Sequence, residues 1–266
     1  MIARVDGVPQ AVVPVQDRGF LHGDSVFEVL RVHRGRPFLL PWHRERLEAG
    51  LAAFRFGDAT RVWDDVTAVL ADAGDRDGVL RIVVTRGEGN VRARLASLTP
   101  RTVVTFRDLP PEGPTLRVTI VDAPRVTRSM PSAQAKYARY LPYLLANDDA
   151  HRLGFDEALL LDEAGDVAEA ATANVFAVID GVLVTPSLAS GILAGITRRW
   201  IVENASGLGL TLAERALARA ELARATEVFL SSSVRLVAPV VACDGTSYSA
   251  PGPTTSVLAT ALAAAM

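Results

Sequence analysis

The stretch EAATANVF, residues 169–176, places the Glu169 carboxylate in a turn of small residues directly before an apolar run. Taken alone, a glutamate is usually a solvated surface residue. The apolar segments 174–179 and 182–185 flank Asp180-Gly181, a pair typical of a tight hairpin turn. The stretch therefore predicts a carboxylate beside the first strand of a β-hairpin.

Outward from this hairpin, the chain alternates between strand-like and helix-like segments. Helical spacing is present in residues 43–53, 62–73, 137–153 and 197–207, and strand-like runs include 25–32, 79–85, 102–106, 228–231 and 239–242. Three prolines and a glycine make residues 107–114 the best linker candidate. We expect a mixed α/β (α+β) fold with a small N-terminal domain (1–107), a linker (108–114) and a larger C-terminal domain (115–266).

The composition restricts the class of protein. The 266 residues are 49% hydrophobic with a net charge of −2, which favours a soluble globular chain and gives no basic character for nucleic acid. The apolar tail, residues 257–266, is too short to span a membrane and predicts a final helix. A single cysteine, Cys243, excludes an intramolecular disulfide and favours a reduced, cytoplasmic setting. We interpret Cys243 as a small core residue.

Lys136 is the only lysine among 28 basic residues. A preference for arginine codons explains the other 27, and an isolated lysine can be accidental. Arginine stays charged, however, whereas a lysine amine can lose its proton and act as a nucleophile. This contrast makes Lys136 a candidate catalytic residue.

Two further segments have both a structural and a functional interpretation. GILAGITR, residues 191–198, is a glycine-containing loop that opens a helix; Thr197 could merely cap that helix, or the free N–H groups could bind a phosphate. FLSSS, residues 229–233, places hydroxyls at a strand end, where they could form a solvated turn. Each signal is weak alone, and their order along the chain carries the weight.

That order resembles the class IV aminotransferases, or fold-type IV pyridoxal-phosphate (PLP) enzymes. The family includes branched-chain aminotransferases, D-amino acid aminotransferases and aminodeoxychorismate lyases. Five motifs are similar to the family's, in order: DRGFLHGDSVFE (17–28), HRERL (43–47), EAATANVF (169–176), LAGITR (193–198) and SVRLVAPV (233–240). The likeness covers nearly the whole chain and implies a C-terminal pseudo-barrel domain.

The resemblance implies a role for each matched position. Lys136 would form a Schiff base with the PLP aldehyde and then shuttle a proton on the substrate. Glu169 would keep the pyridine nitrogen protonated, Tyr140 would bond the phenolic oxygen, and Leu193 would pack on the ring. The implied phosphate contacts are Arg46, Ile196, Thr197 and Ser233, and Gly195 and Ser232 are further implied cofactor-binding residues.

The same family splits between amino transfer and carbon–carbon lysis. Its lyases typically have a catalytic threonine two residues after the aromatic of the first motif, where this chain has Val29 after Phe27. We therefore expect an aminotransferase that acts on a D-amino acid or a branched-chain amino acid with a 2-oxo acid. The alternatives are an aminodeoxychorismate lyase, which forms 4-aminobenzoate and pyruvate, and a non-catalytic binding protein on the same fold.

The substrate side of the site is less defined. The loop TRGEGNVRAR, residues 85–94, resembles the carboxylate-reading loop of D-amino acid aminotransferases but is about one residue longer. Its arginines, Arg86, Arg92 and Arg94, are candidates for the carboxylate contact, and each could equally be a solvated charge. His22, Phe27 and Val29 are further candidates, with His22 either lining the pocket or packed in the core. The resemblance also implies a homodimer.

Overall fold

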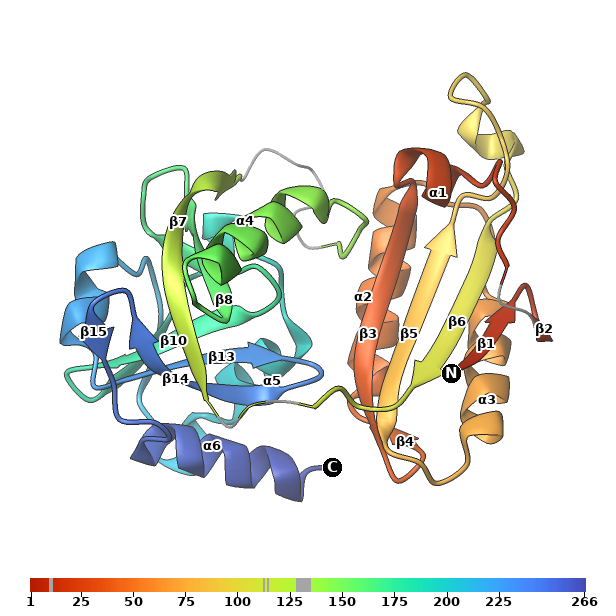
Figure 1. Cartoon of the computed structure of the whole chain (residues 1–266). Helices are drawn as coiled ribbons and strands as arrows, with labels where there is room; N and C mark the ends of the chain where they lie inside the picture. The colour runs from red at the N-terminus through yellow and green to blue at the C-terminus, as the bar shows by residue number, and fades with distance from the viewer. Residues whose placement is uncertain (10–11, 112, 114, 128–134) are drawn as a thin grey trace. The chain divides into compact units, whose positions relative to one another are not determined.

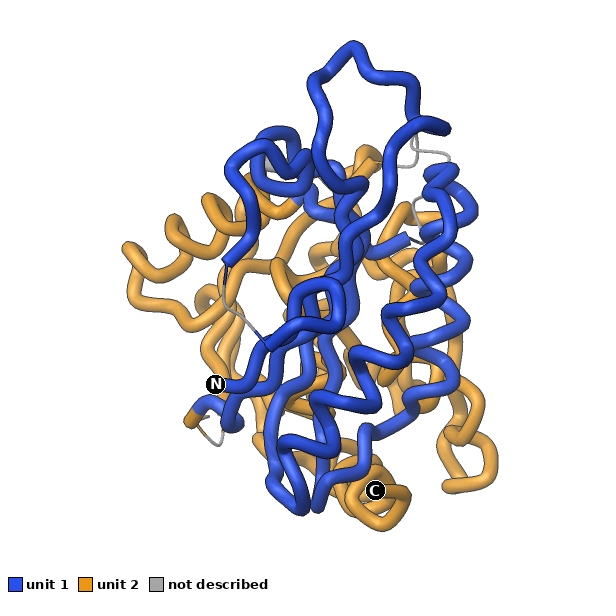
Figure 2. Tube along the Cα trace, turned by 90° about the vertical axis from the view of Figure 1, so that its right-hand side faces the viewer, with its two compact units in different colours: residues 1–110, 134–139 blue, residues 111–133, 140–266 orange. Residues whose placement is uncertain are grey.

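The computed structural model describes residues 1–9, 12–111, 113, 115–127 and 135–266, without the side chains of residues 123–125. The chain divides into two compact units, Met1–Pro110 with Gln134–Arg139, and Pro111–Ala133 with Tyr140–Met266 (Figure 2). The linker predicted at residues 108–114 contains this junction, and its residues 112 and 114 lie outside the described residues. Residues 135–139, which were expected in the C-terminal domain (115–266), group with the first unit.

Unit 1 is a six-stranded sheet with the order β2-β1-β6-β5-β3-β4 (Figure 1). Its strands are β1 (Ile2–Val5), β2 (Val8–Pro9), β3 (Ser25–His33), β4 (Arg36–Pro37), β5 (Gly78–Thr85) and β6 (Arg101–Arg107). Its helices are α1 (Arg18–His22), α2 (Leu40–Ala53), α3 (Val62–Ala73) and the 3-10 turn η1 (Leu95–Ser97).

The core of unit 1 lies between this sheet and the helices α2 and α3. Alternate residues of β3, Val26, Leu30 and Val32, pack with Leu47 of α2 and Val66 of α3. Because side chains alternate across a strand, Phe27 and Val29 lie on the opposite face of β3. One face of β3 therefore belongs to the core of unit 1, and the other face carries the candidate substrate residues Phe27 and Val29.

Unit 2 is a nine-stranded sheet with the order β12-β11-β10-β13-β14-β7-β8-β9, in which β15 pairs with β14. Its strands are β7 (Leu116–Val126), β8 (Glu157–Asp162), β9 (Val167–Ala170), β10 (Asn174–Ile179), β11 (Val182–Thr185), β12 (Leu212–Glu214), β13 (Glu227–Ser232), β14 (Leu236–Cys243) and β15 (Thr246–Ser247). Its helices are α4 (Leu141–Arg152), α5 (Ile196–Asn204) and α6 (Pro253–Ala264), with 3-10 turns η2 (Leu188–Ser190), η3 (Ser206–Leu208) and η4 (Arg219–Arg224).

An additional pairing between β9 and β10, at Glu169 and Asn174, closes six of these strands into a barrel. Leu159, Val175, Leu230 and other apolar side chains fill one side of the curved sheet. Helix α4 covers part of the other side, where Ala146 and Ala150 pack on Leu160. This pairing joins the two ends of the six-strand run and fixes Glu169 next to Asn174.

Most of the predicted elements are present, and the predicted 174–185 hairpin is confirmed as β10 and β11, with positive φ at Asp180 and Gly181. The helix predicted to begin at residue 137 begins at Leu141 instead. Pro142 lies in its first turn, a position that suits proline because no intrahelical N–H is needed there. The helix predicted for 197–207 ends at Asn204 and continues as η3.

Cys243 is buried in the barrel core, as predicted, and burial raises the pKa of its thiol to about 12. Such a thiol stays protonated and is a poor nucleophile. Within the described residues, no helix has the length and apolar character that a membrane crossing requires.

Candidate active site

Lys136 lies in an extended segment that pairs with β3 and not in a helix. The Phe27 amide donates to the Lys136 carbonyl at 2.9 Å, and the Ala138 amide donates to the Ser25 carbonyl at 3.1 Å. The Lys136 Nζ atom is 4.9 Å from the centroid of the Phe27 ring. The main chain therefore fixes the lysine independently of its side chain, and the partly buried amine lies against an aromatic face.

Arg46 forms a bidentate ion pair with Glu28, which is fully buried on the helix-facing side of β3. Arg46 Nε donates to Glu28 Oε1 at 2.7 Å, and Arg46 Nη2 donates to Glu28 Oε2 at 2.6 Å. His43 Nδ1 lies 2.6 Å from Glu28 Oε2. Burial alone would raise the pKa of Glu28, but the Arg46 charge and the hydrogen bonds from His43 and Arg46 hold it at about 2.

Glu169 is buried at the end of β9 and accepts hydrogen bonds from the neighbouring loop. Leu193 N donates to Glu169 Oε2 at 3.0 Å, and Asn174 Nδ2 lies 3.4 Å from the same oxygen while it donates to Leu193 O at 3.0 Å. Tyr143 donates to Glu169 Oε1 at 3.5 Å, and its ring lies 6.0 Å from that of Tyr140. The carboxylate is thus held in one orientation.

Helix α5 begins directly after Gly195, so Ile196 and Thr197 occupy its first turn. No side chain caps this end, and the alternative interpretation of Thr197 as a cap is not observed. The first N–H groups of a helix have no intrahelical partner, and they favour an anion. A Cβ at position 195 would lie 2.0 Å from Asn174 Oδ1, so only glycine allows this close approach.

The strand β13 places the Ser231 hydroxyl in register with Asn174 and Glu169 on the neighbouring strands. Ser231 is opposite Asn174, and Asn174 is opposite Glu169, and side chains of opposite residues share one face. Ser231 Oγ is buried without a hydrogen-bond partner within the described residues. Ser232 Oγ accepts from Arg235 N at 3.3 Å, which closes the turn that carries Ser233.

A partly buried ion pair connects the two turns of unit 2 that carry candidate residues. Glu157, which is fully buried, accepts from Thr172 N at 2.8 Å and from Thr172 Oγ1 at 2.6 Å, and it also pairs with Arg235. Thr172 lies in the turn between Glu169 and Asn174. Glu157 therefore holds that turn and the turn after β13 in a fixed relation.

The unit 2 residues fit the cofactor that the motifs imply. A buried carboxylate suits a protonated ring nitrogen, and the start of α5 suits a phosphate. The Ser231 hydroxyl, which has no hydrogen-bond partner in the described part of the chain, offers a further hydrogen bond. In unit 1, Lys136 supplies an amine and Arg46 a guanidinium. Unit 1 therefore holds two of the residues implied for the cofactor, and unit 2 holds the others.

Arg86, at the start of the loop between β5 and β6, was predicted as a candidate for the contact with the substrate carboxylate. Arg86 is buried; its Nε donates to Asp24 at 3.0 Å, and its Nη1 and Nη2 donate to the carbonyls of Arg55 and Phe54 at 3.0 Å. Its guanidinium also lies 4.0 Å from the centroid of the Phe56 ring. Arg86 is therefore a scaffold residue, because all three of its nitrogens already bind the protein.

Arg92 and Arg94 lie further along the same loop and are exposed. His22 is also exposed at the end of α1, which excludes the alternative that it is packed in the core. Phe27 is buried, and Val29 lies opposite Arg81 of β5. Substrate contact by Arg92, Arg94, His22, Phe27 and Val29 stays a prediction.

Several residues of this site had no role in the sequence analysis. Glu28, His43 and Asn174 lie inside the recognised motifs. The i, i+3 spacing of His43 and Arg46, which places both side chains on one face of a helix, was the signal that could have identified His43. Arg81, whose guanidinium lies 4.5 Å from the centroid of the Phe27 ring, gave no motif signal. Arg81 lies opposite Val29 of β3, and this neighbourhood follows only from the register of the folded sheet.

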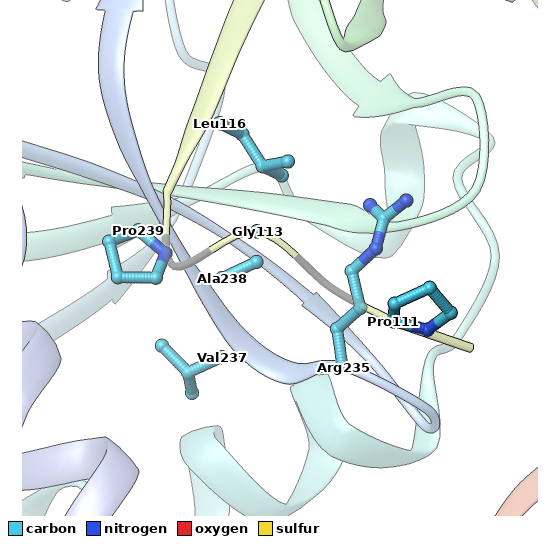
Figure 3. Close-up of a pocket in the computed structure, with 7 residues that line it drawn as sticks. All are labelled: Pro111, Gly113, Leu116, Arg235, Val237, Ala238 and Pro239. Atoms are coloured by element: carbon cyan, nitrogen blue, oxygen red, sulfur yellow. The ribbon is translucent and has the colours of Figure 1, made fainter. Parts of the chain in front are cut away.

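A small pocket of about 160 Å³ in unit 2 is separate from these residues (Figure 3). Arg235 is the one charged residue that lines it, and the full lining is Pro111, Gly113, Leu116, Arg235, Val237, Ala238 and Pro239. Arg235 is paired with Glu157, so its charge is already compensated. None of the predicted site residues lines this pocket.

The family model described as amino-transferase class IV matches residues 25–243. The chain belongs to the class IV aminotransferase family. It is 33% identical over 243 residues to a putative branched-chain-amino-acid aminotransferase of Methanocaldococcus jannaschii, covering 88% of this chain and 84% of the relative. It is 32% identical to an aminodeoxychorismate lyase of Bacillus subtilis, covering 93% and 87% of the two chains. A D-alanine aminotransferase of Bacillus licheniformis is 31% identical, covering 95% and 91%.

The solved structure of Escherichia coli branched-chain amino acid aminotransferase matches with a TM-score of 0.92 at 26% identity, covering 99% of this chain and 93% of that one. The predicted fold-type IV architecture is confirmed, and this class IV aminotransferase belongs to a family of PLP-dependent enzymes. The relatives differ in the reaction they are named for, so family membership does not decide the substrate.

Proposed function

We propose that this chain is a PLP-dependent aminotransferase that moves an amino group between an amino acid of the D or branched-chain type and a 2-oxo acid. The position of Val29 favours amino transfer over carbon–carbon lysis. Val29 and Phe27 lie on one face of β3, and Lys136 Nζ contacts the Phe27 ring on unit 1. Valine offers no hydroxyl to assist the cleavage of a carbon–carbon bond.

Bound PLP would supply an electron sink that stabilises negative charge at the substrate carbon. Glu169 would keep the proton on the ring nitrogen, and Tyr140 would donate to the phenolic oxygen. Arg46, Ser232, Ser233 and the α5 amides after Gly195 would hold the phosphate, while Leu193 would pack on the ring. Lys136 would hold the cofactor aldehyde and would act as the base for the substrate proton.

The lyase remains the second candidate, because one relative of similar identity bears that name. Amino-acceptor dependence distinguishes the two reactions. An aminotransferase requires a 2-oxo acid for turnover with D- or L-amino acids. Release of pyruvate from aminodeoxychorismate without any acceptor would favour the lyase and reject amino transfer as the main activity.

We also propose that the enzyme is a cytoplasmic homodimer. Apolar side chains are exposed on α1 and on the loop after β5, among them Phe20, Leu21, Val91 and Leu95. These segments are neighbours, since Arg18 N donates to Gly87 O at 2.8 Å. An exposed apolar surface of this kind is typical of an interface. Light scattering should give the mass of two chains; a single-chain mass at micromolar concentration would reject the dimer.

Arg81 is expected to select substrates with a second carboxylate. Arg81 is exposed, and its guanidinium and the Lys136 amine both lie against the Phe27 ring. Arg81 therefore lies near the candidate catalytic lysine. Arg81→Gln should raise KM for 2-oxoglutarate by about tenfold or more, the value of one hydrogen-bonded charge pair. KM for pyruvate is the internal control, and an equal rise for both acceptors would reject this role.

Arg92 is expected to contact the substrate α-carboxylate. Its main chain is held by Asn90, whose Oδ1 accepts from Arg92 N at 2.9 Å, and its exposed side chain reaches solvent. Arg92→Ala should raise KM for amino acids by about tenfold and change KM for simple amines far less. Arg94→Ala is the matched loop variant. Parallel losses for amines and amino acids would show that Arg92 acts on the loop and not on the carboxylate.

A further inference from the structure

We propose that Glu28 and His43 are positioning residues that orient the Arg46 guanidinium toward the phosphate of the cofactor. The inference rests on the proposed function, since it takes Arg46 as a phosphate contact. Neither residue touches the reacting atoms in this account. Both act through Arg46.

The geometry of the Glu28–Arg46 pair leaves the guanidinium with one orientation. The carboxylate binds the Nε–Nη2 edge through both of its oxygens, at 2.7 and 2.6 Å. This two-point contact fixes the guanidinium plane as well as its position. The contact therefore sets the direction in which the rest of the guanidinium points.

The position of Glu28 is costly unless it serves such a purpose. Its neighbours on the same face of β3, Val26 and Leu30, belong to the apolar core between the sheet and the helices. A buried ion pair usually stabilises a fold no better than apolar residues of similar size, because both charges lose their hydration. Orientation of Arg46 accounts for a carboxylate at this position.

His43 completes the arrangement one helical turn before Arg46 on α2. Its Nδ1 lies 2.6 Å from Glu28 Oε2, the oxygen that also accepts from Arg46 Nη2. Burial lowers the pKa of His43, and the charges of Arg46 and Lys136 lower it further, while Glu28 opposes them. A neutral His43 donates through Nδ1 and fixes the carboxylate plane without adding charge.

The three groups together carry no net charge, because Glu28 is ionised, His43 is neutral and an arginine side chain keeps its positive charge. Attraction of the phosphate therefore depends on how closely the guanidinium approaches it and not on an excess of positive charge. Removing the Glu28 charge would also relieve its repulsion of the phosphate, so Glu28→Gln gives an ambiguous result. Glu28→Asp keeps the charge and withdraws the carboxylate by one methylene, which isolates orientation.

The test compares PLP with pyridoxal, which lacks the phosphate, in titrations followed by the visible absorbance of the lysine-bound cofactor. Glu28→Asp should raise the Kd for PLP by about tenfold and leave the Kd for pyridoxal within about twofold. Arg46→Lys, which cannot form the bidentate pair, should have the same selective effect. The control Asp65→Asn alters another buried carboxylate of unit 1, hydrogen-bonded to Thr102, and should change neither affinity.

An unchanged PLP affinity in Glu28→Asp, or an equal loss of affinity for PLP and pyridoxal, would overturn the inference. His43→Leu provides a second route if Glu28→Asp does not fold, and it should weaken PLP by about threefold with no change for pyridoxal. A PLP affinity that is unchanged in His43→Leu would equally overturn it. Failure of the wild-type chain to bind PLP would instead remove the proposed function, and this inference with it.

Discussion

Lys136→Ala is expected to abolish the visible absorbance of lysine-bound PLP and to reduce turnover by about a thousandfold or more. Two functions are lost together, the covalent attachment of the cofactor and the positioned base that moves the substrate proton. The fold should survive, because the hydrogen bonds that hold residue 136 against β3 are formed by its main chain. Absorbance, turnover with an amino acid and a 2-oxo acid, and thermal unfolding measure these three outcomes.

Lys136→Arg is the matched control, since it keeps the positive charge but offers no amine that can lose its proton near neutral pH. It should be as inactive as the alanine variant. Turnover within about tenfold of the wild type in either variant would contradict the assignment of Lys136.

Glu169→Gln is expected to reduce turnover by about a hundredfold or more with little loss of stability. The amide can still accept from Leu193 N, as Glu169 Oε2 does at 3.0 Å, so the local hydrogen bonds persist. It cannot hold a proton on the ring nitrogen by charge, and a mutation that removes one such electrostatic contact typically costs two to three orders of magnitude. The effect should therefore appear in kcat more than in KM.

Glu227→Gln is the matched control for a buried carboxylate in unit 2. Glu227 accepts from Thr254 N and Thr255 N at 2.9 Å and so caps the start of α6. Its replacement should lower the melting temperature and leave kcat within about twofold. If Glu169→Gln behaved in this way instead, with normal kcat, Glu169 would have only a structural role.

The sequence predicted local features well where residue chemistry alone determines them. The hairpin at Asp180-Gly181 follows from two residues that tolerate positive φ, and Cys243 lies in the core as its apolar surroundings indicated. The segment after Lys136 shows the limit of periodicity. Its spacing favours a helix from residue 137, but pairing with β3 holds residues 136–138 extended, and Pro142 marks the actual start.

Long-range contacts explain what the sequence could not predict about the candidate site. Arg86 looks like a free loop arginine, and only the folded chain shows its bonds to Asp24, Phe54 and Arg55. Glu28 and Arg46 are separated by 18 positions, and Ser231 meets Asn174 only through the register of β10 and β13. Such partners depend on strand register and helix docking, which one sequence does not determine.

The most direct test of the central claim is borohydride reduction of the chain after incubation with PLP, followed by mapping of the modified peptide. Because Lys136 is the only lysine, the result has little ambiguity. We expect one reduced pyridoxyl group per chain, on Lys136. Modification only of the amino terminus at Met1, or no modification at all, would contradict the assignment of this chain as a PLP-dependent aminotransferase.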